Sequence, residues 1–330
     1  MMLRTIKHTV LLLMVISLGA CQEVIELELP ENEPELVVEG YLTQRDYYIP
    51  EGDLDCSGVV TIPKSDIEFG VALVDAFINI DSIEAEADYF PFNKVQLSTS
   101  VGYFAEGGNP PVRNAVVKLF EDGDEVETLV EDASLPGTYR ITYLPKVGSA
   151  YHLEIEALGN FYETTPETYQ SVAPLLGVNA IYNSNFIGDT CAFYLGIDTY
   201  EKPGKGDHYR WMFYINNEYV DDPVFISTFD DADIDGLCLF EFDVYGNELE
   251  LGDTITVFQI RTSPGYSNFI NSLRNQTAFV GGPFDTPPAP IRGNVKNVST
   301  GEDAFGYFMA GGLSANAGFV PNEIPEGGCD

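Results

Sequence analysis

Short apolar runs with a two-residue period recur along the body of the chain. In residues 151–156, Tyr151, Leu153 and Ile155 alternate with three polar or charged residues, which is the pattern of a strand with one buried face. Similar runs rich in Val, Ile and Tyr occupy residues 36–42, 94–101, 115–120 and 138–144. Turn-forming pairs such as Asp122-Gly123 separate them. Evenly spaced short strands predict a β-sandwich over residues 35–170.

A second β-rich region is expected after a polar linker at residues 164–175. Its predicted strands are 190–198, 208–215, 237–244 and 254–261. In the strand 208–215, Tyr209, Trp211, Phe213 and Ile215 share one face, which we expect to lie in the core.

A helix is predicted over residues 264–278. Ser263 can cap it, Pro264 suits its first turn, and apolar residues follow at helical spacing. The fold class is therefore expected to be mostly β, with two β-sandwich-like domains (35–170 and 171–330) and one or two short helices.

A long segment at about 46–92 is expected to be an insertion in the first domain. Apolar spacing predicts a helix after residue 64, opened by a capping box of Ser65 and Glu68. Aromatic residues flank the segment and could form a platform for a ligand, although core packing is the alternative. They are Tyr47, Tyr48, Tyr89, Phe90 and Phe92.

The N-terminus has the pattern of a bacterial lipoprotein signal. Arg4 and Lys7 precede an apolar run at residues 10–16, and Ser17–Cys21 reads Ser-Leu-Gly-Ala-Cys, a lipobox sequence. We expect residues 1–20 to be the signal peptide, Cys21 to be lipidated, and residues 21–34 to tether the body to outer-membrane lipid. An ordinary signal peptide with a chance cysteine is the alternative.

The net charge of the chain limits the classes of partner that it is expected to bind. With 16 Lys and Arg against 52 Asp and Glu, the formal net charge is −36. Nucleic-acid binding needs a basic footprint, so the composition excludes DNA and RNA as expected partners.

Disulfides are expected in an envelope protein with four cysteines after Cys21. These are Cys56, Cys191, Cys238 and Cys329, which allow three connectivities. Cys191 and Cys238 lie in strand-like runs of one region, and we favour that pair.

Two acidic segments match the first half of an EF-hand-type calcium loop, with oxygen ligands at alternate positions before a glycine. One holds Asp53, Asp55 and Ser57, and the other holds Asp231, Asp233 and Asp235. Both have a non-carboxylate at position 12, Lys64 and Phe242. An acidic loop before a helix and a solvated hairpin tip are the alternatives to calcium as a cofactor.

Signatures of catalysis are weak, so an enzyme is not expected. His152 and His208 have no Ser, Cys or His motif beside them. Gly265–Phe269 begins like a nucleophile elbow but lacks the final glycine.

Two resemblances add to this picture. Pro-Val-x-x-Ala-x-Val, Gly-Thr-Tyr and Tyr-x-Leu-x-Ile within residues 94–165 resemble the transthyretin-like and immunoglobulin-like modules of bacterial surface proteins. Asn275-Gln276, Pro290–Val295 and Gly306–Phe308, with Ile25–Pro30 and Leu36–Gly40 at the start, resemble the lipoprotein family called domain of unknown function 4249.

The family resemblance implies an envelope lipoprotein of gram-negative bacteria, often encoded near TonB-dependent transporters, with no known catalytic residues. We therefore expect a non-catalytic outer-membrane accessory or ligand-capture protein that works with such a transporter. A calcium-stabilised adhesin or glycan-binding surface module is the alternative, and a secreted hydrolase using a carboxylate or Ser267 is a third.

Overall fold

The computed structural model describes residues 33–56, 60–77, 92–102, 105, 107–184, 191–226, 228–246, 248–278 and 291–326. The chain divides into two units, Met1–Glu33 and Pro34–Asp330. The described helices and strands all lie in the second unit. None of the helices among the described residues is long and apolar enough to cross a membrane.

The unit is built mainly of strands, as predicted, with two α-helices and a short 3-10 helix among the described residues. The strands of the first half are β1 (Leu36–Arg45), β2 (Leu54–Cys56), β3 (Val60–Ile62), β4 (Lys94–Thr99), β5 (Val116–Glu121), β6 (Asp124–Thr128), β7 (Val130–Glu131), β8 (Thr138–Arg140), β9 (Ala150–Ala157), β10 (Asn160–Thr164) and β11 (Glu167–Thr168). Those of the second half are β12 (Gly177–Ser184), β13 (Cys191–Tyr200), β14 (His208–Ile215), β15 (Glu218–Tyr219), β16 (Thr228–Asp230), β17 (Cys238–Asp243), β18 (Thr254–Thr262), β19 (Arg292–Asn297) and β20 (Asp303–Phe319). The helices are α2 (Lys64–Phe77), η1 (Pro223–Phe225) and α4 (Pro264–Thr277).

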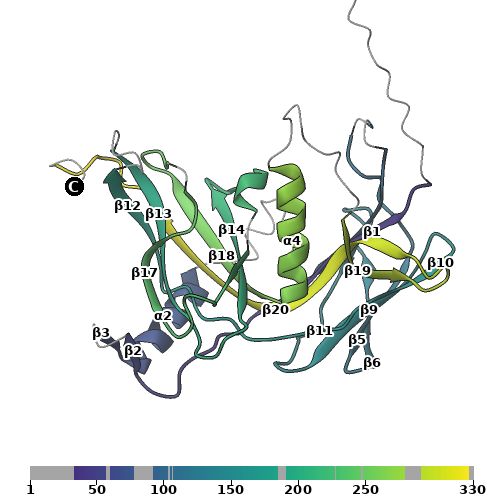
Figure 1. The fold of residues 1–330 in the computed structure, drawn as a ribbon, viewed down its shortest axis with the longest axis horizontal. Helices are drawn as coiled ribbons and strands as arrows, with labels where there is room; N and C mark the ends of the chain where they lie inside the picture. The colour runs from purple at the N-terminus through teal and green to yellow at the C-terminus, as the bar shows by residue number, and fades with distance from the viewer. Residues whose placement is uncertain are drawn as a thin grey trace, which may run out of the picture. The chain divides into compact units, whose positions relative to one another are not determined.

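One long strand, β20, joins the two halves of the chain. It pairs parallel with β1 and antiparallel with β19 and β18, and Figure 1 shows it passing from β19 and β1 across to β18. The resulting 15-stranded sheet contains the path β6-β5-β9-β10-β19-β20-β1-β4-β8-β7. This corrects the expectation of two separate domains meeting at residue 170, because β19 and β20 complete a sheet that the first half begins.

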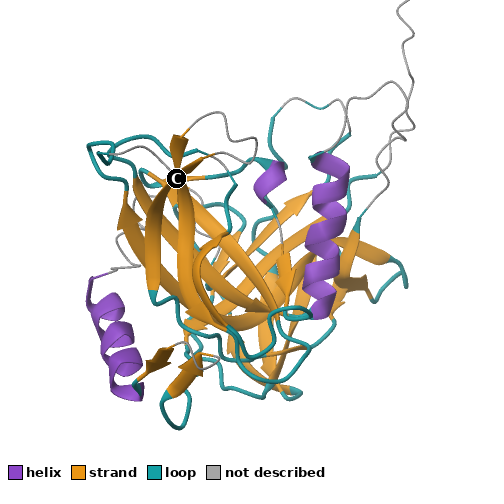
Figure 2. Ribbon diagram, turned by 60° about the vertical axis from the view of Figure 1, so that its left-hand side comes forward, coloured by secondary structure: helices purple, strands orange, loops and turns teal. Residues whose placement is uncertain are grey.

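Alternating side chains build the core as the sequence predicts. Tyr151, Leu153 and Ile155 of β9 are fully buried and pack with Leu36 and Val38 of β1. In β14 the prediction was incomplete, because this strand is buried on both faces. Trp211 and Phe213 lie in one apolar cluster, and Met212 and Tyr214 lie in another, which α4 covers. Figure 2 shows α4 standing against the strands.

The ends of the two helices are fixed differently. α4 begins where predicted, and its N-cap Ser263 accepts a hydrogen bond from the Tyr266 backbone N–H at 3.1 Å. α2 begins at Lys64, so Ser65 lies inside the helix and the expected capping box is wrong. Instead the Asp53 carboxylate accepts the Lys64 backbone N–H at 3.0 Å.

The disulfide pairing expected from the sequence is also wrong. Cys238 is bonded to Cys56 of β2, not to Cys191. Cys238 lies opposite Tyr200 in the β13–β17 pairing, at the other end of β13 from Cys191, roughly 30 Å away along an extended strand. Cys191 is also disulfide-bonded, in a bond separate from Cys56–Cys238.

Candidate functional site

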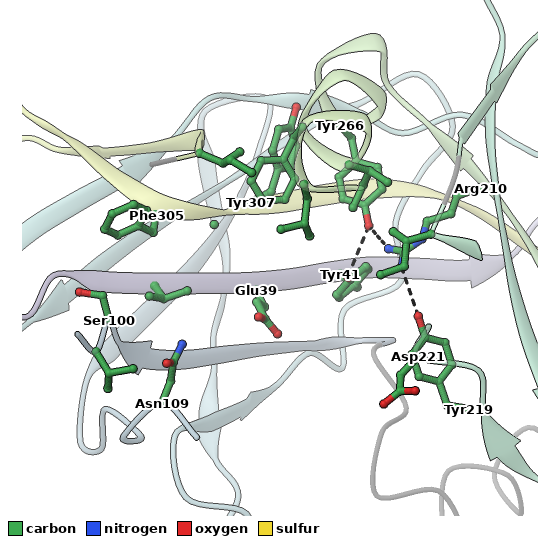
Figure 3. Close-up of a pocket in the computed structure, with 18 residues that line it drawn as sticks. Glu39, Tyr41, Ser100, Asn109, Arg210, Tyr219, Asp221, Tyr266, Phe305 and Tyr307 are labelled. Carbon is green, nitrogen blue, oxygen red and sulfur yellow. Dashed lines mark hydrogen bonds between the residues drawn. The ribbon is translucent and has the colours of Figure 1, made fainter. Parts of the chain in front are cut away.

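A cavity lies between α4 and the open face of β1 and β20. Its volume is about 790 Å³, within the range of small-molecule sites. Apolar and aromatic side chains dominate its lining, with few polar groups (Figure 3). The lining residues are Val37, Glu39, Tyr41, Ser100, Val101, Asn109, Arg210, Tyr219, Asp221, Ile226, Tyr266, Phe269, Ile270, Leu273, Ile291, Phe305, Gly306 and Tyr307.

The two-residue period of β1 supplies the floor of this pocket. Leu36, Val38 and Leu42 face the core, so Glu39 and Tyr41 point from the opposite face into the pocket. The parallel register places Glu39 opposite Tyr307 of β20. The face of β1 that carries Glu39 and Tyr41 thus forms the floor of the pocket, because α4 lies over it.

Arg210 of β14 closes one end of the pocket. It is only 4 % exposed, and its guanidinium donates hydrogen bonds to the Tyr266 hydroxyl and, at 3.4 Å, to the Tyr219 hydroxyl. The Tyr266 hydroxyl in turn donates to the Tyr41 hydroxyl at 3.4 Å. The guanidinium carbon also lies 5.9 Å from the centre of the Tyr266 ring. Tyrosine oxygens and an aromatic face therefore solvate this buried charge.

Glu39 is the acidic group on the pocket floor. Its side chain is exposed to the pocket space, yet the protein around it desolvates the carboxyl and raises its pKa, against the attraction of Lys94 and Arg210. Among the described residues, nothing donates a hydrogen bond to this carboxylate or forms an ion pair with it. The pocket thus presents an acid that Lys94 and Arg210 attract without a hydrogen bond to its carboxylate.

A second, smaller cavity of about 600 Å³ lies on the other side of Tyr307. The Tyr307 hydroxyl donates to Glu167 Oε1 at 2.6 Å, and burial raises the pKa of Glu167. Within the described part of the chain, Glu167 Oε2 has no hydrogen-bond partner.

The second acidic segment is partly assembled in the structure. Carboxylate oxygens of Asp231, Asp235 and Glu201 lie within 4.8 Å of one another. Asp233 is exposed and outside this group, whereas Glu201, which no sequence pattern indicated, belongs to it. Asp231 accepts the backbone N–H groups of Gly206 and Asp207.

Burial and hydrogen bonds act in opposite directions on the pKa values of Asp231 and Glu201. Burial works to raise the pKa of Asp231, but the backbone N–H groups of Gly206 and Asp207 outweigh it and lower that pKa. Burial raises the pKa of Glu201, against hydrogen bonds from the Gly236 N–H and the Tyr209 hydroxyl.

In the first acidic segment, the structure shows a carboxylate that caps helix α2. Asp53 holds the start of α2, Asp55 lies exposed in β2, and Ser57 lies outside the described residues. Apart from Glu201, Asp231 and Asp235, the described ranges contain no group of three acidic, His or Cys ligands placed to share a metal.

The remaining candidates fall in three places. Cys21, Tyr89 and Phe90 lie outside the described residues. Phe92 is 1 % exposed and belongs to the core, which agrees with the core-packing alternative. Tyr48 is half-buried and packs against the cluster around Tyr200. Ser267 is buried, 3.2 Å from the Thr262 hydroxyl, and His152 stacks on Phe120.

The model of the family described as "Domain of unknown function (DUF4249)" matches residues 92–314. The chain belongs to this family. No curated protein and no solved structure matches it. The DUF4249 match includes Arg210, Tyr266 and Tyr307 of the pocket, whereas Glu39 and Tyr41 precede it.

Sequence reasoning did not find the pocket in this DUF4249 protein. One local signal was present: Arg210 interrupts the apolar run Tyr209–Ile215, and a charge inside a buried strand requires a specific polar partner. Glu39 carried no such signal, because an acid on the polar side of a strand is ordinary.

Proposed function

We propose that this protein is a non-catalytic lipoprotein of the outer membrane that captures a small ligand and works as an accessory to a TonB-dependent transporter. The observation that carries the capture function is the cavity of about 790 Å³ between α4 and the β1–β20 floor. Its lining combines many apolar and aromatic side chains with a few polar groups, which is the composition of small-molecule sites.

The membrane location rests on the N-terminal sequence. The lipobox at Ser17–Cys21 supports acylation of Cys21, and several acyl chains hold a protein on a bilayer far longer than one. The link to a transporter rests on the family resemblance alone.

Capture is tested by analysing what the purified protein carries. The full-length chain is isolated in mild detergent and denatured, and released small molecules are identified by mass spectrometry. We expect a compound in near-equimolar amount from the wild type. We expect its loss in Leu273→Trp, because the indole ring is much larger than the leucine side chain and occupies space in the pocket. Leu251→Trp is the matched control, since Leu251 is exposed and outside the pocket lining. A wild type that carries no compound contradicts capture.

The transporter link is tested by co-purification. A C-terminally tagged chain is extracted with mild detergent, and stoichiometric partners are identified by mass spectrometry. A β-barrel transporter is expected with the wild type and not with a Cys21→Ala variant that cannot be acylated. Recovery of the lipoprotein alone would remove the accessory role.

A second candidate function is a calcium-stabilised adhesin or glycan-binding module. The observation that favours it is the approach of Glu201, Asp231 and Asp235 to within 4.8 Å, because carboxylate oxygens are preferred calcium ligands. This function requires calcium to raise the melting temperature of chelator-treated protein. Asp235→Asn should reduce that rise, and Asp233→Asn, outside the group, should not.

A further inference from the structure

The Glu39 carboxylate faces an apolar pocket without a direct counter-charge. A charged group that is desolvated by the surrounding protein is stabilised by an opposite charge placed next to it. Among the described residues, the basic groups that act on Glu39 are Lys94 and Arg210, and both act through charge attraction without a hydrogen bond to the Glu39 carboxylate. Figure 3 shows the Glu39 side chain directed into the open space of the pocket. A bound molecule is therefore placed to supply the missing positive charge.

Arg210 is already committed to other groups. Its guanidinium donates to the Tyr266 and Tyr219 hydroxyls and lies near the Tyr266 ring. These contacts hold the guanidinium at the wall formed by β14, β15 and α4. The pocket also contains the Asp221 carboxylate, so its acidic groups outnumber its basic one.

Aromatic rings flank Glu39 on the pocket floor. Tyr41 follows two residues later on the same face of β1, and Tyr307 is the neighbour of Glu39 on β20. The faces of tyrosine rings attract cations, and the attraction increases where water is excluded. A carboxylate near such rings adds its own charge attraction for an ammonium group to that of the ring faces.

We propose that this pocket binds a small organic cation, with its ammonium group beside Glu39 and its apolar body against Phe269, Ile270 and Leu273 of α4. This rests on the proposed capture function and names the chemical class of the captured ligand. The net charge of −36 supports it independently, because a strongly acidic protein concentrates cations near its surface.

The test compares two ligands of nearly the same shape. Phenyltrimethylammonium carries the positive charge, and tert-butylbenzene is its neutral carbon analogue. Binding of each to the compact unit Pro34–Asp330, which contains all the described core clusters, is measured by calorimetry at pH 8 and low salt. We expect the cation to bind at least about tenfold more tightly than the neutral analogue.

Two variants separate the local carboxylate from the overall charge. Glu39→Gln should remove the preference for the cation and leave the affinity for tert-butylbenzene unchanged. Glu163→Gln makes the same change of charge on the exposed face of β10 and should keep the preference. Equal binding of both ligands by the wild type, or a preference that survives Glu39→Gln, would overturn the proposal.

The result also separates this proposal from the one on which it rests. If the wild type carries a compound that Leu273→Trp loses, but that compound or the test ligands show no preference for positive charge, capture stands and the cation is wrong. If no compound is carried and neither test ligand binds, both proposals fail.

Discussion

The Tyr307 hydroxyl donates a hydrogen bond of 2.6 Å to Glu167 Oε1, joining residues 140 positions apart in the sequence. The Tyr307 ring forms part of the pocket wall beside α4. Glu167 is only 6 % exposed. A buried carboxyl therefore orients one of the rings that shape the proposed site, and its ionisation is coupled to folding.

Glu167→Gln is expected to change how stability depends on pH. Burial raises the pKa of Glu167 above its usual 4.5, so its contribution to the free energy of unfolding is fully present below that value. The contribution is lost as the pH rises through the higher folded-state pKa. A glutamine still accepts the Tyr307 hydrogen bond and does not titrate. Melting temperatures between pH 5 and 8 should therefore fall less in the variant than in the wild type. Equal pH slopes would show that Glu167 does not titrate in this range.

Glu121→Gln is expected to change the pH dependence of stability in the direction opposite to Glu167→Gln. Hydrogen bonds from Lys146 and Tyr151, and then from Tyr143, lower the pKa of Glu121 to about 2. The stabilisation is present above the unfolded-state value and is lost as the pH falls towards about 2. At pH 7 we expect a loss of about 2 kcal/mol in the free energy of unfolding, because bonds to a charged group are removed.

Urea unfolding at pH 7 and pH 3 measures this difference, which should shrink at the lower pH. Glu125→Gln is the control, because its ion pair with Lys118 is well exposed and surface pairs contribute little. A Glu121→Gln variant as stable as Glu125→Gln would contradict the role of the buried hydrogen bonds.

Local patterns predicted the elements of this fold well. The alternation in β9 places Tyr151, Leu153 and Ile155 in the core, and the cap at Ser263 starts α4 at Pro264. Both are decided by neighbours within a few residues, which a single sequence records.

The long-range arrangement was not predictable in the same way. The parallel pairing of β1 with β20, which sets Glu39 beside Tyr307, joins opposite ends of the chain. Cys56 lies in the β2–β3 hairpin and Cys238 in β17. Their disulfide depends on where the hairpin packs in the fold, which the strand pattern around each cysteine does not indicate. Glu39 becomes a site residue only because α4 covers its face, and no local pattern contains that information.

Loss of the Cys56–Cys238 disulfide is expected to destabilise the unit. The bond spans 182 residues, so its removal frees a long loop in the unfolded chain and lowers the free energy of unfolding by roughly 2–5 kcal/mol. Urea unfolding of Cys56→Ser, Cys238→Ser and the double variant should give the same loss, and hydrogen exchange should increase in α2. A single variant as stable as the wild type would contradict this pairing.

Gly306→Ala is expected to separate β20 from β1. Gly306 has a φ of +92°, and a Cβ there would lie 1.9 Å from the Val38 carbonyl oxygen. Backbone strain and overpacking together should lower the free energy of unfolding by roughly 3–5 kcal/mol. Gly301→Ala is the matched control, because Gly301 has a φ of +85° but no described heavy atom within 4 Å of its added Cβ. Its loss should be about 1–2 kcal/mol, from the backbone conformation alone.

Urea unfolding of the two glycine variants measures the difference. Because Gly306 also lines the pocket between Phe305 and Tyr307, only Gly306→Ala should also weaken phenyltrimethylammonium binding. Equal losses of stability in the two variants would mean that β20 can move away from Val38 without disturbing the sheet. In that event the close approach of the two strands would not be what holds Glu39 and Tyr307 together.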